Sequence, residues 1–221
     1  MRLRFAIPAL ATVLLLADMP SAVSFTATTA NIASAPEPVR IEILRWSTDE
    51  ERDKLMSAWS LKPAATPGSK AGKGAGKQGK ASKGPGPGGG AAAAQSPEAA
   101  LARALQEAAT VGYLWSSEMA GYALRYAGKI ENSDGSQRII LITQRKLGTV
   151  NQVWRPTVEG APNTYEFSVI ELRLNAKGEG EGRVSLLGRV AEDAVAKIVA
   201  IENYNALPVV FREVRKVEGR P

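Results

Sequence analysis

Short segments in which apolar and polar residues alternate dominate the second half of the chain, from residue 111 to residue 217. The clearest is Tyr165–Val190, where an arm rich in β-branched and aromatic residues (165–174) and an alternating arm (183–190) flank a glycine-rich stretch. Glycine accepts positive φ and asparagine tolerates it, so the chain can reverse between the two arms. The pattern predicts a β-hairpin inside a larger antiparallel sheet.

Further strands are predicted from the same kind of alternation. They lie near residues 39–45, 111–116, 121–129, 137–146, 195–204 and 208–217, which with the hairpin arms at 164–174 and 182–190 makes about eight. Turn signals at 132–135 and 192–193 separate some of them. Short strands at regular spacing favour an antiparallel barrel or sandwich. Residues 139–142 and 169–170 are apolar on both faces, so one face of the sheet is expected to meet the core and the other the helices.

Two helices are predicted directly after the first of these strands. Ser47 or Thr48 can cap the first helix, and the acidic residues that follow favour its positive N-terminal end. Ser96 and Pro97 suit the start of the second helix, which keeps helical spacing to about residue 110. The predicted class is therefore α+β, mainly β, with two helices inserted after the first strand.

The stretch between the two helices, residues 62–95, is a Lys/Gly/Ala/Pro-rich insertion without a large apolar residue. Such a composition cannot offset the entropy lost on ordering, so a disordered loop is expected. Its lysines could bind polyanions weakly, as a tether: Lys70, Lys73, Lys77, Lys80 and Lys83. The stretch has no aromatic residue for stacking on bases, so specific nucleic-acid binding is not expected.

The N-terminus has the order of regions that is typical of a secretory signal. Arg2 and Arg4 precede an apolar run from Phe5 to Ala17, and small residues follow. The run is shorter than the roughly 20 residues that a spanning helix needs, so no transmembrane segment is expected once the signal is removed. We expect a signal peptide at 1–24, a flexible lead-in at 25–37, a single β-rich domain at 38–217, and export to the periplasm or beyond the cell.

Composition narrows the possible chemistry. The 221 residues include no cysteine and no histidine, which removes disulfides, thiolate nucleophiles, the commonest general base and the commonest transition-metal ligand. The formal net charge of +6 arises from the lysine-rich insertion, because basic and acidic residues nearly balance elsewhere. The domain itself therefore has no basic excess of the kind that marks a nucleic-acid-binding fold.

Four charged residues stand beside apolar neighbours in the predicted strands and are candidate ligand-binding residues: Arg125, Glu171, Arg173 and Glu202. Glu171 and Arg173 point to the same side of an extended strand. Facing inward they would form a buried ion pair or part of a ligand pocket, and facing outward they would be surface charges. The glycine-rich turn lacks the ligand spacing of a calcium loop, and we predict no metal site, no cofactor and no catalytic residue.

Four segments together resemble a family of small exported bacterial proteins that has no established function. They are RWSTDEERDKL (45–55), RIILITQRKLG (138–148), FSVIELRLN with GEGEG (167–182) and AIENYNALPVVFREVR (200–215). The resemblance covers most of 39–217 and implies export and a single β-rich domain, but no activity. In that family a short connector joins the two helices, so residues 62–95 depart from its pattern as an insertion.

Three functions are compatible with these patterns. The first is a non-enzymatic exported module that binds a small apolar ligand or a partner protein. The second is a hydrolase that uses carboxylates alone, with a pair such as Glu42 and Glu171 or Glu166 and Glu202. The third is an envelope-associated structural protein held by its lysine tether.

Overall fold

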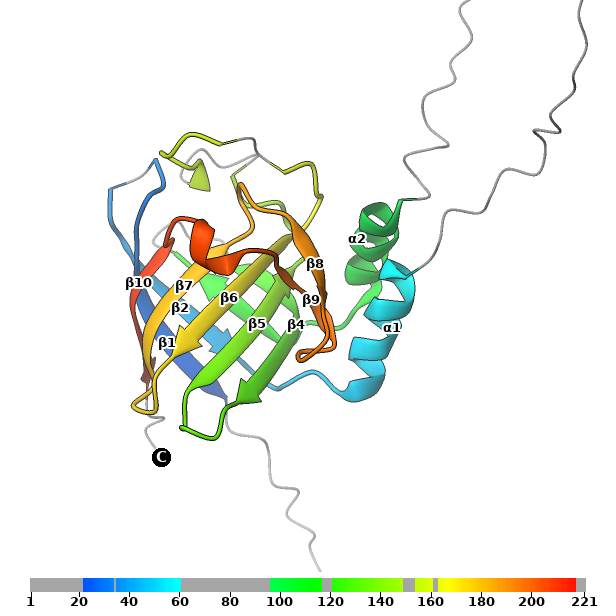
Figure 1. The fold of residues 1–221 in the computed structure, drawn as a ribbon, viewed down its shortest axis with the longest axis horizontal. Coiled ribbons are helices and arrows are strands. Elements are labelled where there is room, and N and C mark those ends of the chain that lie inside the picture. The colour runs from blue at the N-terminus through cyan, green and yellow to red at the C-terminus, as the bar shows by residue number, and fades with distance from the viewer. Residues whose placement is uncertain are drawn as a thin grey trace, which may run out of the picture.

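A computed structural model describes residues 22–33, 35–60, 96–116, 121–148, 154–160 and 163–217. Eight strands form a closed barrel in the order β1-β10-β7-β6-β5-β4-β3-β2, and all neighbouring pairs are antiparallel (Figure 1). The barrel strands are β1 (Val23–Thr29), β2 (Pro38–Ile43), β3 (Gly112–Trp115), β4 (Tyr122–Glu131), β5 (Gln137–Thr143), β6 (Ser168–Leu174), β7 (Glu179–Val184) and β10 (Phe211–Val217).

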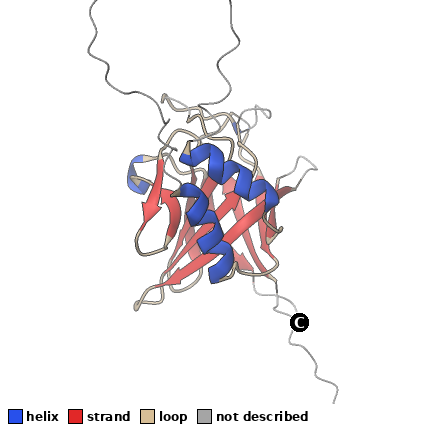
Figure 2. Ribbon diagram, turned by 90° about the vertical axis from the view of Figure 1, so that its right-hand side faces the viewer, coloured by secondary structure: helices blue, strands red, loops and turns tan. Residues whose placement is uncertain are grey.

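Four smaller elements lie outside the barrel wall. They are the helices α1 (Asp49–Trp59) and α2 (Pro97–Glu107), the hairpin of β8 (Val190–Asp193) and β9 (Ile198–Ile201), and the 3-10 turn η3 (Tyr204–Ala206). The hairpin lies between the barrel and the helices in Figure 1, and Figure 2 shows both helices lying across one face of the barrel. Within the described ranges, neither helix is long and apolar enough to cross a membrane.

Side chains fill the interior of the barrel. Residues alternate between inward and outward along the strands, except at register shifts in β1, β4 and β10, and the inward residues form one apolar cluster that includes Phe25, Ile41, Leu114 and Ile170. Trp154, from the connection between β5 and β6, joins the cluster and is fully buried. Eight strands enclose a space that side chains alone can fill, and here they do.

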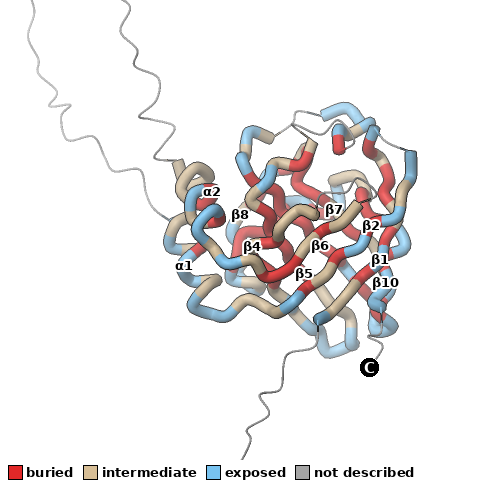
Figure 3. The backbone as a smooth tube through the Cα atoms, turned by 180° about the vertical axis from the view of Figure 1, so that it is seen from behind, coloured by how far each residue is buried: buried red, intermediate tan, exposed pale blue. Residues whose placement is uncertain are grey.

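The outer face of β4, β5 and β6 belongs to a second apolar cluster. Ile140, Ile142 and Val169 point outward and pack with residues of α1, α2 and the β8–β9 hairpin, such as Leu101 and Ile198. The strands that were predicted to be apolar on both faces are therefore buried on both, as the red segments of β4, β5 and β6 in Figure 3 illustrate. This confirms that one face meets the core and the other a helical layer.

The helix starts lie where the sequence placed them. Thr48 caps α1 in a capping box with Glu51, whose carboxylate also receives two hydrogen bonds from Arg45 at 2.7 and 2.8 Å. Ser96 caps α2, and Pro97 occupies its first turn. The capping residues alone were therefore sufficient to locate the N-termini of both helices.

The prediction of a flexible lead-in over 25–37 is wrong for its first part, because Val23–Thr29 forms β1. β1 lies between β10 and β2, and its residue Phe25 is only 1% exposed. The alanines and threonines around Phe25 gave no apolar pattern that would have revealed the strand. The helices consequently follow the second strand, and the domain begins before residue 38. Of the expected signal peptide 1–24, residues 1–21 lie outside the described residues, as does the insertion 62–95.

The second arm of the predicted hairpin is shifted toward the N-terminus. β7 spans Glu179–Val184, so Gly180 and Gly182 lie inside the strand and the turn is confined to residues 175–178. A Cβ at Gly182 would stand 2.5 Å from a methyl group of Leu172 and 3.0 Å from the ring of Phe211. Glycine is needed here to make room for large neighbours rather than to turn the chain.

Candidate functional site

Glu171 and Arg173 project from the outer face of β6, since the residues between and beside them, Ile170 and Leu172, point into the barrel. The two side chains form an ion pair at 3.0 Å. Although it faces outward, the Glu171 side chain is 0% exposed. The predicted pairing of Glu171 with Arg173 is therefore present, but its environment is neither the barrel interior nor an open surface.

Arg138 of β5 is the main partner of the buried carboxylate. Its guanidinium donates to both oxygens of Glu171, at 2.8 and 3.1 Å, and to Asp193 of β8 at 2.7 Å. Burial raises the pKa of Asp193, but hydrogen bonds from the Ala196 amide and from Arg138 outweigh this effect, so its pKa lies below the ordinary value. Arg138 thus joins the hairpin to the barrel wall through two carboxylates.

Tyr204 of η3 is held against the same part of the wall. The guanidinium groups of Arg173 and Arg183 lie 3.7 and 4.5 Å from the centre of its ring, and Arg183 also donates to the Tyr204 carbonyl. Burial raises the pKa of Tyr204 to about 12. These contacts dock η3 on β6 and β7.

The charges of this cluster are matched within it. Its three arginines pair with three acidic residues, namely Arg138 and Arg173 with Glu171, Arg138 with Asp193, and Arg183 with Glu181. No formal charge is left over to attract a ligand, and the chemistry of the cluster is that of a structural ion network.

The other two predicted residues lie elsewhere. Arg125 of β4 donates at 2.9 Å to the carbonyl of Ala108, which is the C-cap of α2, and at 2.8 Å to Gln144, so it fixes the end of a helix. Glu202, directly after β9, lies 3.7 Å from Arg189 in an exposed pair. Of the four candidate ligand-binding residues, only Glu171 and Arg173 therefore contact one another.

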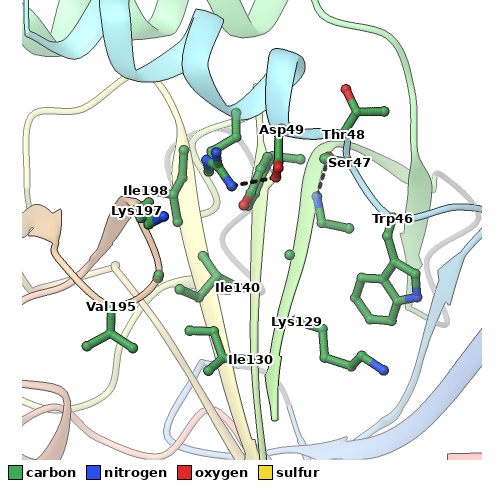
Figure 4. A pocket seen from close by; sticks show the side chains of 15 residues that line it. Trp46, Ser47, Thr48, Asp49, Lys129, Ile130, Ile140, Val195, Lys197 and Ile198 are labelled. Atoms are coloured by element: carbon green, nitrogen blue, oxygen red, sulfur yellow. Dashed lines mark hydrogen bonds and ion pairs between the residues drawn. The ribbon is translucent and has the colours of Figure 1, made fainter.

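A groove on the outside of the barrel is a better candidate site. It has a volume of about 390 Å³ and runs between the start of α1, the outer face of β4 and the β8–β9 turn. In Figure 4 Val195 of the turn and Ile198 of β9 line one side and Trp46 the other, with Ile130 and Ile140 between them. Ile140 and Ile198 are almost fully buried, so Trp46, Ile130 and Val195 supply the accessible apolar surface of the groove.

Tyr126 and Gly128 shape the floor of this groove together. Both point outward from β4, and a Cβ at Gly128 would stand 2.5 Å from the Tyr126 hydroxyl, so the ring lies along the strand over the glycine. Burial raises the pKa of Tyr126 to about 12, which keeps the phenol protonated at neutral pH. Within the described part of the chain, its hydroxyl has no hydrogen-bond partner.

Polar groups gather at the edges of the groove. Arg52 pairs with Asp49 at 2.6 Å, and Lys129 pairs with Glu131 at 2.7 Å while its ammonium lies 5.6 Å from the centre of the Trp46 ring. Ser47 continues the wall beside β4, because it donates its amide to Ala127 and accepts from the Ala127 amide. The groove therefore combines accessible apolar side chains with polar and charged groups.

Sequence reasoning missed this groove because its lining comes from four separate segments: 46–52, 126–130, 140 and 195–198. None of them contains a recognisable motif. The lysines of the predicted tether lie outside the described residues, and among the described residues no three acidic side chains gather as metal ligands would. Comparison of the chain with family models, with curated proteins and with solved structures gave no match.

Proposed function

We propose that this protein is a non-enzymatic, exported binding module that holds a small apolar ligand in the groove between α1, β4 and the β8–β9 turn. The groove itself is the observation that carries the proposal. Its volume of about 390 Å³ falls within the range of roughly 300–1,000 Å³ that ligand pockets occupy. The exposed parts of Ile130 and Val195 would bury apolar surface against the ligand, and the charged border would orient it.

The ligand is expected on the outside of the barrel because the inside is occupied. Phe25, Leu114 and Trp154 belong to an interior cluster in which each of the three is at most 1% exposed. Barrels that bind a ligand within their lumen need inward residues small enough to leave a cavity. The export part of the proposal rests on the N-terminal charge and hydropathy pattern alone.

The positions of Glu42 and Glu171 do not suit hydrolysis by that pair of carboxylates. Glu42 on β2 and Glu171 on β6 both point outward, and β2 and β6 are separated by three strands on either side of the closed barrel. Two carboxylates that act on one glycosidic bond stand roughly 5–10 Å apart. Both oxygens of Glu171 are also already bonded to Arg138.

A partner protein is the second candidate occupant, because of one residue at the border of the groove. Val195, at the tip of the β8–β9 turn, is 74% exposed, the highest value among the large apolar residues with notable exposure. A ligand confined to the groove would leave much of this side chain in water, whereas a protein surface could cover it.

Titration with a neutral, apolar fluorescent probe such as N-phenyl-1-naphthylamine tests the proposal. We expect one saturable site, and an affinity lowered about tenfold by Ile130→Ser, because that change removes roughly two methylene equivalents of contact. Val195→Ser, at the border of the groove, should weaken binding as well, and Val217→Ser is its matched control, since both valines are exposed and Val217 lies at the end of β10, away from the groove. Probe binding that does not saturate, or that Val217→Ser weakens as much as the groove variants do, would contradict the proposal.

Native mass spectrometry of the protein purified from its own host separates the two candidate occupants. A small extra mass that is lost on denaturation supports the ligand, and an extra mass in the kilodalton range supports the partner protein.

A further inference from the structure

Lys197 occupies an unusual backbone position at the border of the groove. It is the last residue of the β8–β9 turn and has a φ of +54°. This left-handed region favours glycine or asparagine, because a side chain crowds the following carbonyl. A lysine here keeps a cationic group beside the groove at a position where glycine would suit the turn better.

The charge of Lys197 is the one cationic charge of the groove lining that is not matched. Arg52 contacts both Asp49 and Asp53, and Lys129 contacts Glu131. For Lys197, by contrast, the described part of the chain provides no ion-pair partner, and its side chain is exposed. Since the single acid in the lining, Asp49, is already bonded to Arg52, one positive charge remains for a ligand.

A neutral donor lies in the same groove. The Tyr126 hydroxyl stands over Gly128, and no hydrogen-bond partner for it exists among the described residues. A protonated phenol and an ammonium group are both donors, so the groove offers donors to a ligand that carries hydrogen-bond acceptors.

We infer that the ligand of the groove is a free aliphatic carboxylate, whose chain lies against Trp46, Ile130 and Val195 and whose carboxylate is held by Lys197. This inference rests on the function proposed above and adds the class of ligand to it. The accessible apolar side chains of the groove would bind the aliphatic chain of the ligand, and the unmatched charge of Lys197 would bind its carboxylate head group.

A matched series of ten-carbon ligands separates the two contributions. Decanoate, decanol and decylammonium are titrated against the full-length mature protein by displacement of the neutral probe. Decanoate is expected to bind about fivefold more tightly than decanol, as an accessible ion pair contributes, and decylammonium more weakly than either. The preference for decanoate is expected to shrink at high salt.

Lys197→Gly tests the role of the lysine without a risk to folding, because glycine suits a positive φ. We expect its thermal midpoint to stay unchanged or rise, and its affinity for decanoate to fall to that for decanol. Lys177→Gly is the matched control, since Lys177 is an exposed turn lysine at the far end of the β6–β7 hairpin. Tyr126→Phe is expected to weaken decanoate binding less than Lys197→Gly does.

Each outcome bears on one of the two proposals. If decanoate and decanol bind equally well, or if Lys197→Gly keeps the preference, the inference about the carboxylate is wrong while the apolar groove stands. If neither the probe nor any member of the series binds, both the proposed function and the inference about the carboxylate are wrong. Binding to phosphatidylglycerol vesicles without binding to decanoate would assign the anion to a lipid surface and overturn the inference as well.

Discussion

Removal of Arg138 should destabilise the protein strongly, since it would leave the buried Glu171 carboxylate with a single partner. The Arg138 guanidinium donates two of the three hydrogen bonds to that carboxylate, at 2.8 and 3.1 Å, and the third comes from Arg173, whose side chain is 44% exposed. Breaking a buried pair by removing one partner costs about 3–5 kcal/mol. We therefore expect Arg138→Met to lower the free energy of unfolding by about 3 kcal/mol, toward the lower limit because Arg173 remains.

Urea unfolding followed by tryptophan fluorescence, with thermal unfolding in parallel, measures this change. A loss of about 3 kcal/mol corresponds to a midpoint roughly 6–12 °C lower for a domain of this size. Arg40→Met is the control, because Arg40 and Glu42 form an exposed pair at 3.7 Å that should contribute less than about 1 kcal/mol. The double variant Arg138→Met/Glu171→Leu removes both charges and should regain most of the loss.

Two results would refute this reasoning. A loss below about 1 kcal/mol for Arg138→Met would mean that solvent reaches Glu171 readily. A double variant as unstable as the single one would mean that Arg138 acts through packing of its aliphatic stem, rather than by neutralising a buried charge.

Two further predictions concern pH and the N-terminal strand. Burial raises the pKa of Tyr126 and of Tyr204 to about 12, from an unfolded value near 10, so the stability that their protonated forms confer is present below about pH 10 and is lost as pH rises toward 12. The urea midpoint of unfolding should fall across that pH window, and it should fall less steeply in Tyr126→Phe. An equally steep fall in the variant would contradict the role given to Tyr126. A chain that begins at Val23 should have the full thermal stability of the barrel. A chain that begins at Thr28 lacks Phe25, so its free energy of unfolding should be lower by about 3–5 kcal/mol, or it should fail to fold, as far-UV circular dichroism would show. If the shorter chain folds and is equally stable, β1 does not have the proposed role in closing the barrel.

Much of the fold was predictable from local patterns. The two-residue alternation predicted β4, β5 and β6. The apolar runs at 139–142 and 169–170 correctly predicted that β5 and β6 are buried on both faces. Thr48 and Ser96 located the helix starts through their own hydrogen bonds. These features depend on residues a few positions apart, so the sequence contains them directly.

The candidate site was not predictable in the same way. Glu171 and Arg173 were identified as a pair on one side of a strand, but what covers that side depends on the β8–β9 hairpin, about twenty residues further along the chain. Arg125 was chosen for its charge among apolar neighbours, and only the position of α2 shows that it caps a helix. Charge beside apolar neighbours therefore did not by itself indicate burial, since Glu171 is fully buried whereas Glu202 is exposed.

By itself the sequence determined the class of the fold, its helix caps, its strands with two apolar faces and the absence of cysteine and histidine chemistry. Only the tertiary structure decided that β1 closes a barrel with β10, that the lumen is full, and that a groove forms between α1, β4 and the β8–β9 turn. The physical reason is one of range. Capping and alternation act between neighbours in the chain, whereas barrel closure and the groove depend on segments that meet only after the sheet has curved and the helices have packed onto it.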